Sequence, residues 1–165
     1  MKRREFSMLG LASVLPALAQ AQSAEPGAPI DWPVISVLGG DKLDPASWRG
    51  KPAIVVFWAT YCPYCKRHNA HIEKLYRATQ GQSLRVLGVA LDTDEGAVRR
   101  YMAINGYSFP VALDGGVLRQ RLTPRRVIPM TCVLDRLGRV VQAIPGEMAE
   151  DDVLGFARLS QRPEI

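Results

Sequence analysis

The feature that most constrains this chain is a continuous apolar run at residues 53–59, which leads into a Cys-Pro-Tyr-Cys sequence beginning at Cys62. A strand without a polar face is covered on both sides, as in the middle of an α/β sheet. A helix is expected to follow at residues 64–80, because apolar side chains recur there at helical spacing and Gly81 ends the pattern. The two cysteines therefore lie where a buried strand meets the start of a helix.

The rest of the chain alternates between short apolar runs and helix-like segments. The clearest helix is expected at residues 95–105, where Asp94 can cap the first turn. Its expected apolar stripe consists of Val98, Tyr101, Met102 and Ile104. The other expected elements are a hairpin at residues 32–43, strands at residues 84–91, 109–113, 130–134 and 140–144, and helices at residues 117–122 and from about residue 149. This order predicts one mixed sheet with helices on both faces.

The length and charge of the chain narrow the possible classes of protein. With 165 residues, the chain suits a single domain with its own hydrophobic core. The formal net charge is +5, and the basic side chains are scattered except between Arg119 and Arg126. Aromatic and basic residues do not alternate as they do on many nucleic-acid-binding surfaces, so we expect no nucleic-acid partner.

The first residues have the pattern of a secretory signal peptide. A basic start at residues 2–4 precedes an apolar run at residues 8–19, and Ala21 completes an A-x-A cleavage pattern. The basic start also resembles a twin-arginine signal. We therefore predict a signal peptide at residues 1–21, a linker at residues 22–31 and a folded domain at residues 32–165, which lies in the periplasm. An uncleaved membrane anchor is the alternative interpretation of the first segment.

The start of a helix is a favourable place for a reactive thiol. The first turn has unpaired backbone N–H groups and the positive end of the helix dipole, which stabilise a thiolate and lower its pKa. Cys62 is therefore the expected nucleophile, and Cys65, one turn further along the buried stripe, is expected to resolve the mixed disulfide. Pro63 is compatible with this position, because its missing N–H would have no partner in the first turn.

The same cysteines also fit half of a zinc site. His68 and His71 follow them on the expected helix and are conceivable as the remaining ligands. On one continuous helix, however, four such side chains spread over about half a turn or more and do not converge on one ion. We therefore expect no metal and no other cofactor.

Together these features resemble the thioredoxin superfamily and, within it, the exported TlpA-like and ResA-like thiol–disulfide oxidoreductases. The likeness covers residues 32–157. It rests on Arg-Gly-Lys-Pro at residues 49–52, Phe-Trp-Ala-Thr at residues 57–60, the expected strand and helix at residues 92–113, and Ile-Pro-Met-Thr at residues 128–131. The implied structure is an α/β, thioredoxin-like fold: a central mixed sheet with helices on both faces and a TlpA-like strand–helix insertion.

The resemblance also implies an activity, which is thiol–disulfide exchange through a redox-active Cys62–Cys65 disulfide. In the family a cis-proline packs beside the cysteines, and that position falls on Pro129. The backbone of the preceding residue, Ile128, would pair with a substrate chain. The residues that would bind substrate or support the pair are Trp58, Tyr61, Pro63, Tyr64, Ile128 and Pro129. The implied partners are disulfide-bonded or dithiol client proteins and a membrane thiol reductase that donates electrons.

Several positions depart from the family pattern. Tyr61 stands where a tryptophan usually precedes the first cysteine, and the Pro-Tyr pair between the cysteines is typical of glutaredoxins. Val56 occupies the place of thioredoxin's buried aspartate, so that proton carrier is absent. His68 stands where this branch often has a glutamate. We predict that its imidazole carries the proton that Cys65 loses before it attacks, with simple packing of the ring as the alternative.

The third cysteine, Cys132, stands apart from the pair. It lies inside the apolar run at residues 130–134, where a small thiol packs as a hydrophobic group. We expect it to be buried and inert, and a resolving or regulatory thiol is the alternative.

Three functions remain open for a protein with this cysteine pair. The favoured one is a periplasmic reductase of disulfides in exported client proteins. An oxidant or disulfide isomerase would use the same site in another direction, and a copper-binding or heme-maturation protein would use the same cysteines as ligands. A peroxidase is disfavoured, because the sequence has no Pro-x-x-x-Thr-x-x-Cys pattern.

Overall fold

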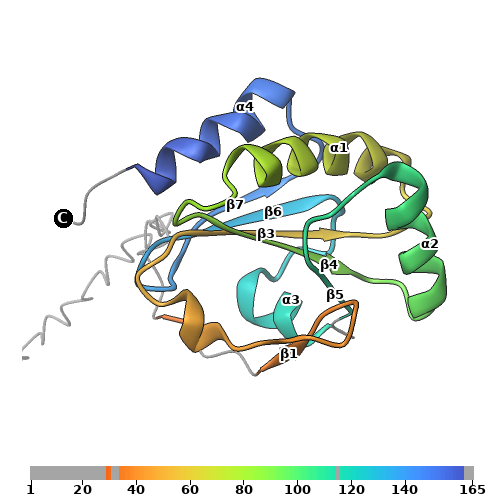
Figure 1. Ribbon diagram of the computed structural model, residues 1–165, viewed down its shortest axis with the longest axis horizontal. Helices are drawn as coiled ribbons and strands as arrows, with labels where there is room; N and C mark the ends of the chain where they lie inside the picture. Colours follow the sequence, from red (N-terminus) through yellow and green to blue (C-terminus); the bar gives the residue numbers. More distant parts are fainter. Residues whose placement is uncertain (1–28, 31–33, 114–115, 162–165) are drawn as a thin grey trace, which may run out of the picture.

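A five-stranded mixed sheet forms the centre of the protein, in the order β5-β4-β3-β6-β7 (Figure 1). The computed structural model describes residues 29–30, 34–113 and 116–161. Parallel pairing joins β4 to β3 and β5, and antiparallel pairing joins β6 to β3 and β7. The mixed sheet predicted from the sequence is confirmed. Its strands are β3 (Ala53–Trp58), β4 (Arg85–Ala90), β5 (Val111–Leu113), β6 (Met130–Leu134) and β7 (Val140–Pro145).

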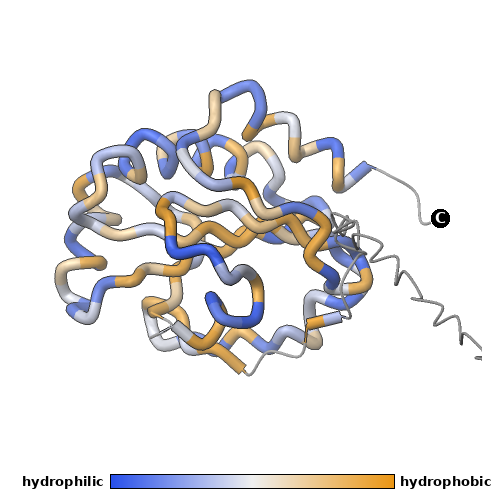
Figure 2. The backbone as a smooth tube through the Cα atoms, turned by 180° about the vertical axis from the view of Figure 1, so that it is seen from behind, coloured by the Kyte–Doolittle hydropathy of each residue, from blue (hydrophilic) through white to orange (hydrophobic). Residues whose placement is uncertain are grey.

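The central strand, β3, is apolar along its whole length and is buried throughout. Successive side chains of a strand point to opposite faces of the sheet. Ile54 and Val56 accordingly join the hydrophobic core on one face, while Val55 and Phe57 join the core on the other. Figure 2 shows the hydrophobic colour running along the central strands. The prediction of a strand covered on both sides is confirmed.

Helices cover both faces of this sheet (Figure 1). The core that contains Ile54 also includes buried residues of α1 (Pro63–Ala78), α2 (Glu95–Asn105) and α4 (Glu150–Gly155). The opposite core includes buried residues of α3 (Val117–Leu122) and β1 (Ile35–Ser36), which pairs with β2 (Lys42–Leu43) in the predicted hairpin. Two short 3-10 helices, η1 (Pro45–Trp48) and η2 (Phe156–Ser160), complete the elements of the described residues.

The predicted bounds and cap of α2 are confirmed, but one residue of its predicted apolar stripe is wrong. The Asp94 carboxylate accepts the Ala97 N–H at 3.1 Å. Val98 and Met102 are buried, whereas Ile104 is 83% exposed. Each helical residue turns by about 100°, so Ile104 lies roughly 120° around the helix from Val98 and faces solvent.

A buried carboxylate fixes the site helix, α1, against the loop before β5. Glu73 accepts hydrogen bonds from the Ser108 N–H and hydroxyl, both at 2.7 Å, and from the Phe109 N–H at 3.2 Å. Burial by itself would raise the pKa of Glu73, but these hydrogen bonds and one from Arg77 lower it below its ordinary value. The carboxylate therefore stays ionised and holds α1 in position.

The predicted signal peptide at residues 1–21 and most of the predicted linker lie outside the described residues. The domain boundaries therefore stay predictions. Within the part of the chain that the structure describes, no helix has the length and apolar character needed to cross a membrane.

Candidate active site

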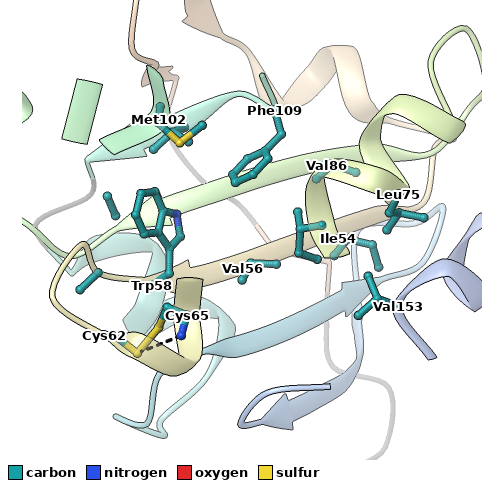
Figure 3. Packing of buried hydrophobic residues seen from close by; sticks show 14 of the residues in the cluster. Ile54, Val56, Trp58, Cys62, Cys65, Leu75, Val86, Met102, Phe109 and Val153 are labelled. Carbon is teal, nitrogen blue, oxygen red and sulfur yellow. Dashed lines mark hydrogen bonds between the residues drawn. A yellow bond between two sulfur atoms is a disulfide. The ribbon is translucent and has the colours of Figure 1, made fainter. Parts of the chain in front are cut away.

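The cysteine pair lies where the sequence predicted, at the junction of β3 and α1. Cys62 is the N-terminal cap of α1, and a disulfide bond joins it to Cys65 across a Cα–Cα distance of 5.2 Å. The Cys65 N–H donates a hydrogen bond to Cys62 Sγ at 3.2 Å (Figure 3). A sulfur that already receives an N–H of the first helical turn is well placed to carry negative charge, so the geometry favours Cys62 as the thiolate.

The two sulfur atoms differ in their access to solvent. Cys62 is 8% exposed, whereas Cys65 is fully buried in the core beneath α1. A substrate that approaches from solvent can therefore meet Cys62 before Cys65. This asymmetry favours Cys62 as the attacking sulfur and Cys65 as the resolving sulfur, roles that stay predictions.

The other residues predicted around the pair differ in exposure: some lie at the surface, and one lies in the core. Tyr61 and Tyr64 are 74% and 59% exposed, and Pro63 is exposed at the first position of α1. Trp58, in contrast, is fully buried, and its ring centroid lies 5.2 Å from that of Tyr101. Figure 3 shows Trp58 beside the cysteine pair, among core residues. Trp58 therefore supports the site from the core that it shares with the cysteines, while the two tyrosines are available to a substrate.

The loop before β6 brings Ile128 and Pro129 to the cysteine pair. The Ile128–Pro129 peptide bond is cis, as the resemblance implied. The Ile128 carbonyl oxygen lies 4.0 Å from Cys62 Sγ, and the Pro129 carbonyl accepts the Gly146 N–H at 2.8 Å. The structure thus places both residues beside the reactive sulfur, and a role for them in substrate binding stays a prediction.

His68 is fully buried on α1, with both ring nitrogens in contact with other elements. The Met148 N–H donates to Nδ1 at 3.3 Å, and Nε2 lies 3.0 Å from Thr131 Oγ1. Because an amide N–H can only donate, Nδ1 is unprotonated, and Nε2 carries the proton of the neutral ring. Burial, followed by the charge of His71, lowers the pKa of His68 to about 4.

This arrangement limits how His68 can carry a proton. To accept the proton of Cys65, Nδ1 would have to release the Met148 N–H. Among the described residues, no hydrogen bond joins the imidazole to either cysteine of the pair. The proton-carrier role stays a prediction. The contacts of the ring with Thr131 and Met148 connect α1 to β6 and to the loop after β7.

The structure also reveals supporting residues that the sequence analysis missed. Asp92, just after β4, accepts the Thr60 N–H at 3.0 Å and the Thr60 hydroxyl, which fixes the loop that leads to Cys62. Arg67 on α1 makes a bidentate ion pair with Glu147, with distances of 2.6 and 2.8 Å to its two carboxylate oxygens. The partners are 32 and 80 residues apart in the sequence, so no local pattern indicates them.

Cys132 is confirmed as a buried thiol of the core. It is fully buried on β6, and burial raises its pKa to about 12. We expect alkylation of the native, reduced protein to label at most two thiols rapidly, with Cys132 reacting only in denaturant. Mass spectrometry of the labelled protein counts the modified thiols, and rapid labelling of three would contradict the burial of Cys132.

The described residues contain a cavity but no cluster of metal-ligating side chains. Across residues 29–30, 34–113 and 116–161, no three His, Cys, Asp or Glu side chains gather in a way that could hold a metal ion. A cavity of about 440 Å³ is lined by Trp48, Tyr76 and Arg85 among others. Arg85 is the first residue of β4 and pairs with Ala53 at the start of β3, whereas Cys62 follows the other end of β3. This cavity therefore lies away from the site.

Comparison with known proteins connects this geometry to disulfide chemistry. A model of the AhpC/TSA family matches residues 33–143. The thiol-disulfide oxidoreductase ResA of Halalkalibacterium halodurans is 32% identical over 126 residues, which cover 76% of this chain and 72% of the relative. ResA of Bacillus subtilis is 26% identical over 170 residues, which cover 96% and 94%. A solved thiol:disulfide interchange protein of the thioredoxin family from Chlorobium tepidum matches with a TM-score of 0.72 at 25% identity, over 83% of this chain and 97% of that one. The predicted thioredoxin-like fold is confirmed.

Proposed function

Because this chain belongs to the AhpC/TSA family of the thioredoxin superfamily and is a thiol–disulfide oxidoreductase of the ResA type, we propose that it reduces disulfide bonds in exported client proteins. The observation that carries the proposal is the Cys62–Cys65 pair at the start of α1, with one accessible and one buried sulfur. A reduced pair of this kind supplies both electrons that a client disulfide needs, so the exchange requires no further cofactor.

The proposed reaction consists of two exchange steps. First, the Cys62 thiolate attacks one sulfur of the client disulfide and forms a mixed disulfide, while the other client sulfur leaves as a thiolate and takes up a proton. Cys65 then loses its proton and attacks the sulfur of Cys62. This second step restores the Cys62–Cys65 disulfide and releases the remaining client sulfur, so the client is reduced and the enzyme is oxidised.

The geometry of the site supports each step. The N–H of Cys65 already points at Cys62 Sγ, where it can stabilise the attacking thiolate. The Cα atoms of the pair are 5.2 Å apart, within the usual range for a disulfide, so Cys65 can attack without a movement of the backbone. Beside the sulfur, the backbone of Ile128 offers an edge to which an extended client segment can add as a strand.

We further propose that the reaction takes place in the periplasm. The support for this location is the signal-peptide pattern of residues 1–21. An oxidising compartment would leave the pair as a disulfide, so a reductase there needs a source of electrons. A membrane thiol reductase that exchanges disulfides with Cys62 is the proposed donor.

Reduction of a model client tests this function. The fully reduced protein is mixed with disulfide-bonded insulin under nitrogen, and the thiols of both proteins are counted by mass spectrometry after acid quenching. We expect two insulin thiols to appear for each Cys62–Cys65 disulfide that forms, and a Cys132→Ala variant to behave like the wild type. Oxidation of dithiol peptides by the disulfide form, without reduction of insulin by the reduced form, would instead identify an oxidant.

A further inference from the structure

Two segments form the surroundings of the reactive sulfur, and both carry positively charged side chains that have no part in the exchange reaction. One runs through β3 into α1 (residues 53–72), and the other runs from Gly116 through α3 into β6 (residues 116–134). Neither segment contains an Asp or a Glu. The basic residues that they carry are Lys66, Arg67, Arg119, Arg121, Arg125 and Arg126. The surface near Cys62 is therefore built almost without negative charge of its own.

Two carboxylates of the described residues approach this surface from other elements, and both have partners. Glu147, in the loop after β7, is held by Arg67 through two of the guanidinium nitrogens. Asp92, after β4, accepts both the N–H and the hydroxyl of Thr60. Arg67 is therefore neutralised by an ion pair, and the remaining positive charge comes from Lys66, from α3 and from the loop before Pro129.

One arginine fixes the shape of that loop. Arg119 donates from Nε to the Arg125 carbonyl at 3.1 Å and from Nη2 to the Val127 carbonyl at 3.2 Å. These two carbonyls lie on either side of Arg126 in the chain, so a single side chain holds the backbone around it. The loop is thereby held in one conformation while the guanidinium groups of Arg125 and Arg126 are left for other contacts.

Arg125 and Arg126 are exposed, and their side chains have no hydrogen-bond or ion-pair partner within the described part of the chain. Arg126 precedes Ile128 by two residues, and the Ile128 carbonyl lies 4.0 Å from Cys62 Sγ. A backbone spans at most about 3.5 Å per residue, so the Cα atom of Arg126 lies within roughly 7 Å of that of Ile128. A client segment that pairs with Ile128 therefore passes within reach of both guanidinium groups.

Exposed apolar side chains lie next to these charges. Tyr61, Tyr64 and Val127 are all at least half exposed, although each is a large hydrophobic residue. Tyr61 and Tyr64 flank the first cysteine, and Val127 follows the two arginines. We call these five residues the client rim: Tyr61, Tyr64, Arg125, Arg126 and Val127.

We propose that the client rim selects segments with an Asp or Glu two or three residues from the reacting cysteine and an apolar side chain beside it. This inference rests on the proposed disulfide exchange at Cys62, but it concerns recognition of the client and not the direction of electron flow. A guanidinium group matches a carboxylate in geometry as well as in charge. Exposed ion pairs add little affinity, whereas a surface of one charge accelerates the encounter, so the selection acts on the rate of mixed-disulfide formation.

Peptide substrates test this inference. Three disulfide-cyclised peptides of one sequence carry Asp, Asn or Lys at the second and third positions from the cysteine on its outer side. The second-order rate constant of exchange is measured by acid quenching and mass spectrometry at low and at high salt. We expect the Asp peptide to react about tenfold faster than the Lys peptide at low salt and the difference to shrink to less than about twofold near 1 M salt.

Variants of the rim locate the effect. An R125Q/R126Q variant is expected to lose the preference for the Asp peptide, and an R125E/R126E variant is expected to prefer the Lys peptide. The matched control is R85Q/R158Q, which removes the same charge far from the cysteine pair. Arg85 is the first residue of β4, at the end of the strands opposite to Cys62. Arg158 lies on η2, which contacts the same end of the sheet through a Ser83–Ser160 hydrogen bond. This control is expected to keep the preference of the wild type.

Exchange is measured in both directions, with the reduced protein on disulfide peptides and the oxidised protein on dithiol peptides. The charge preference is expected in whichever direction the exchange runs, so failure of the reductase proposal alone leaves it standing. Equal rates for the three peptides, or a preference that survives R125Q/R126Q, overturn the inference even when the peptides are reduced efficiently. Absence of exchange in both directions overturns the inference and the proposed function together.

Discussion

Replacing Cys62 by serine is expected to abolish disulfide exchange, with a rate below about one-thousandth of that of the wild type. A serine oxygen cannot form a disulfide with a client sulfur, and the remaining thiol, Cys65, is fully buried. Insulin reduction with a chemical dithiol as the electron source measures the loss. A Cys132→Ala variant, which removes a thiol outside the pair, should retain the wild-type rate.

The partner substitution, Cys65→Ser, should fail at a different step. Cys62 remains available to attack, but nothing resolves the product, so a mixed disulfide between Cys62 and the client should accumulate. A non-reducing gel and mass spectrometry detect this complex. If Cys62→Ser accumulated a mixed disulfide and Cys65→Ser did not, the two roles would be reversed.

The second large effect expected is a pH-dependent loss of stability that originates at His68. The buried ring stays neutral in the folded protein down to a pKa of about 4, whereas an unfolded chain binds the proton at the ordinary pKa of 6.5. Between these values the unfolded state holds more protons, so the free energy of unfolding decreases as the pH falls from 6.5 to 4. The decrease should be about 3 kcal/mol, since each pKa unit corresponds to roughly 1.4 kcal/mol.

Urea denaturation between about pH 7 and pH 5 measures the first part of this decrease, about 2 kcal/mol, because carboxylates with lowered pKa, such as Glu73, lose their contribution only at lower pH. A His68→Gln variant should show a much smaller dependence on pH in this range. A His71→Gln variant removes only the secondary contribution of His71 to the pKa of His68 and should keep most of the dependence of the wild type. Parallel curves for the wild type and His68→Gln would show that the imidazole does not cause the dependence.

The His68→Gln variant also distinguishes the two possible roles of the imidazole, packing and proton transfer. If His68 carries the proton of Cys65, the pH profile of insulin reduction should change in His68→Gln, because the resolving step loses its acceptor. Superimposable profiles would exclude the proton carrier and leave the ring with the role that its hydrogen bonds to Thr131 and Met148 indicate.

Elements with local signals could be predicted from the sequence almost to the residue. The helix at residues 95–105 was predicted from the Asp94 cap and the apolar spacing, and in the structure Asp94 caps it and Gly106, in a left-handed conformation, ends it. The strand expected at residues 109–113 is shorter, because the Phe109 N–H bonds to Glu73 instead of to a neighbouring strand. Ile104 was assigned to the buried face from its apolar character, although its angular position on α2 places it in solvent.

In the candidate site, too, features that depend on neighbouring residues could be predicted, whereas contacts between residues far apart in the sequence could not. The position of Cys62 and Cys65 followed from a strand, a helix start and a proline, all within one short stretch of sequence. The partners of His68 did not, because Thr131 and Met148 are 63 and 80 residues away. The clamp that Arg119 forms on the neighbouring loop also lacked a signal, since a guanidinium bonded to backbone carbonyls leaves no pattern in the side chains.

The reduction potential of the Cys62–Cys65 pair tests the proposed function most directly. The protein is equilibrated in buffers of defined dithiol and glutathione potential, and its free thiols are counted by mass spectrometry after alkylation. A reductase of client disulfides is expected to have a potential near or below about −250 mV, in the range of thioredoxin. A potential above roughly −180 mV, in the range of protein disulfide isomerase and stronger oxidants, would contradict the proposal.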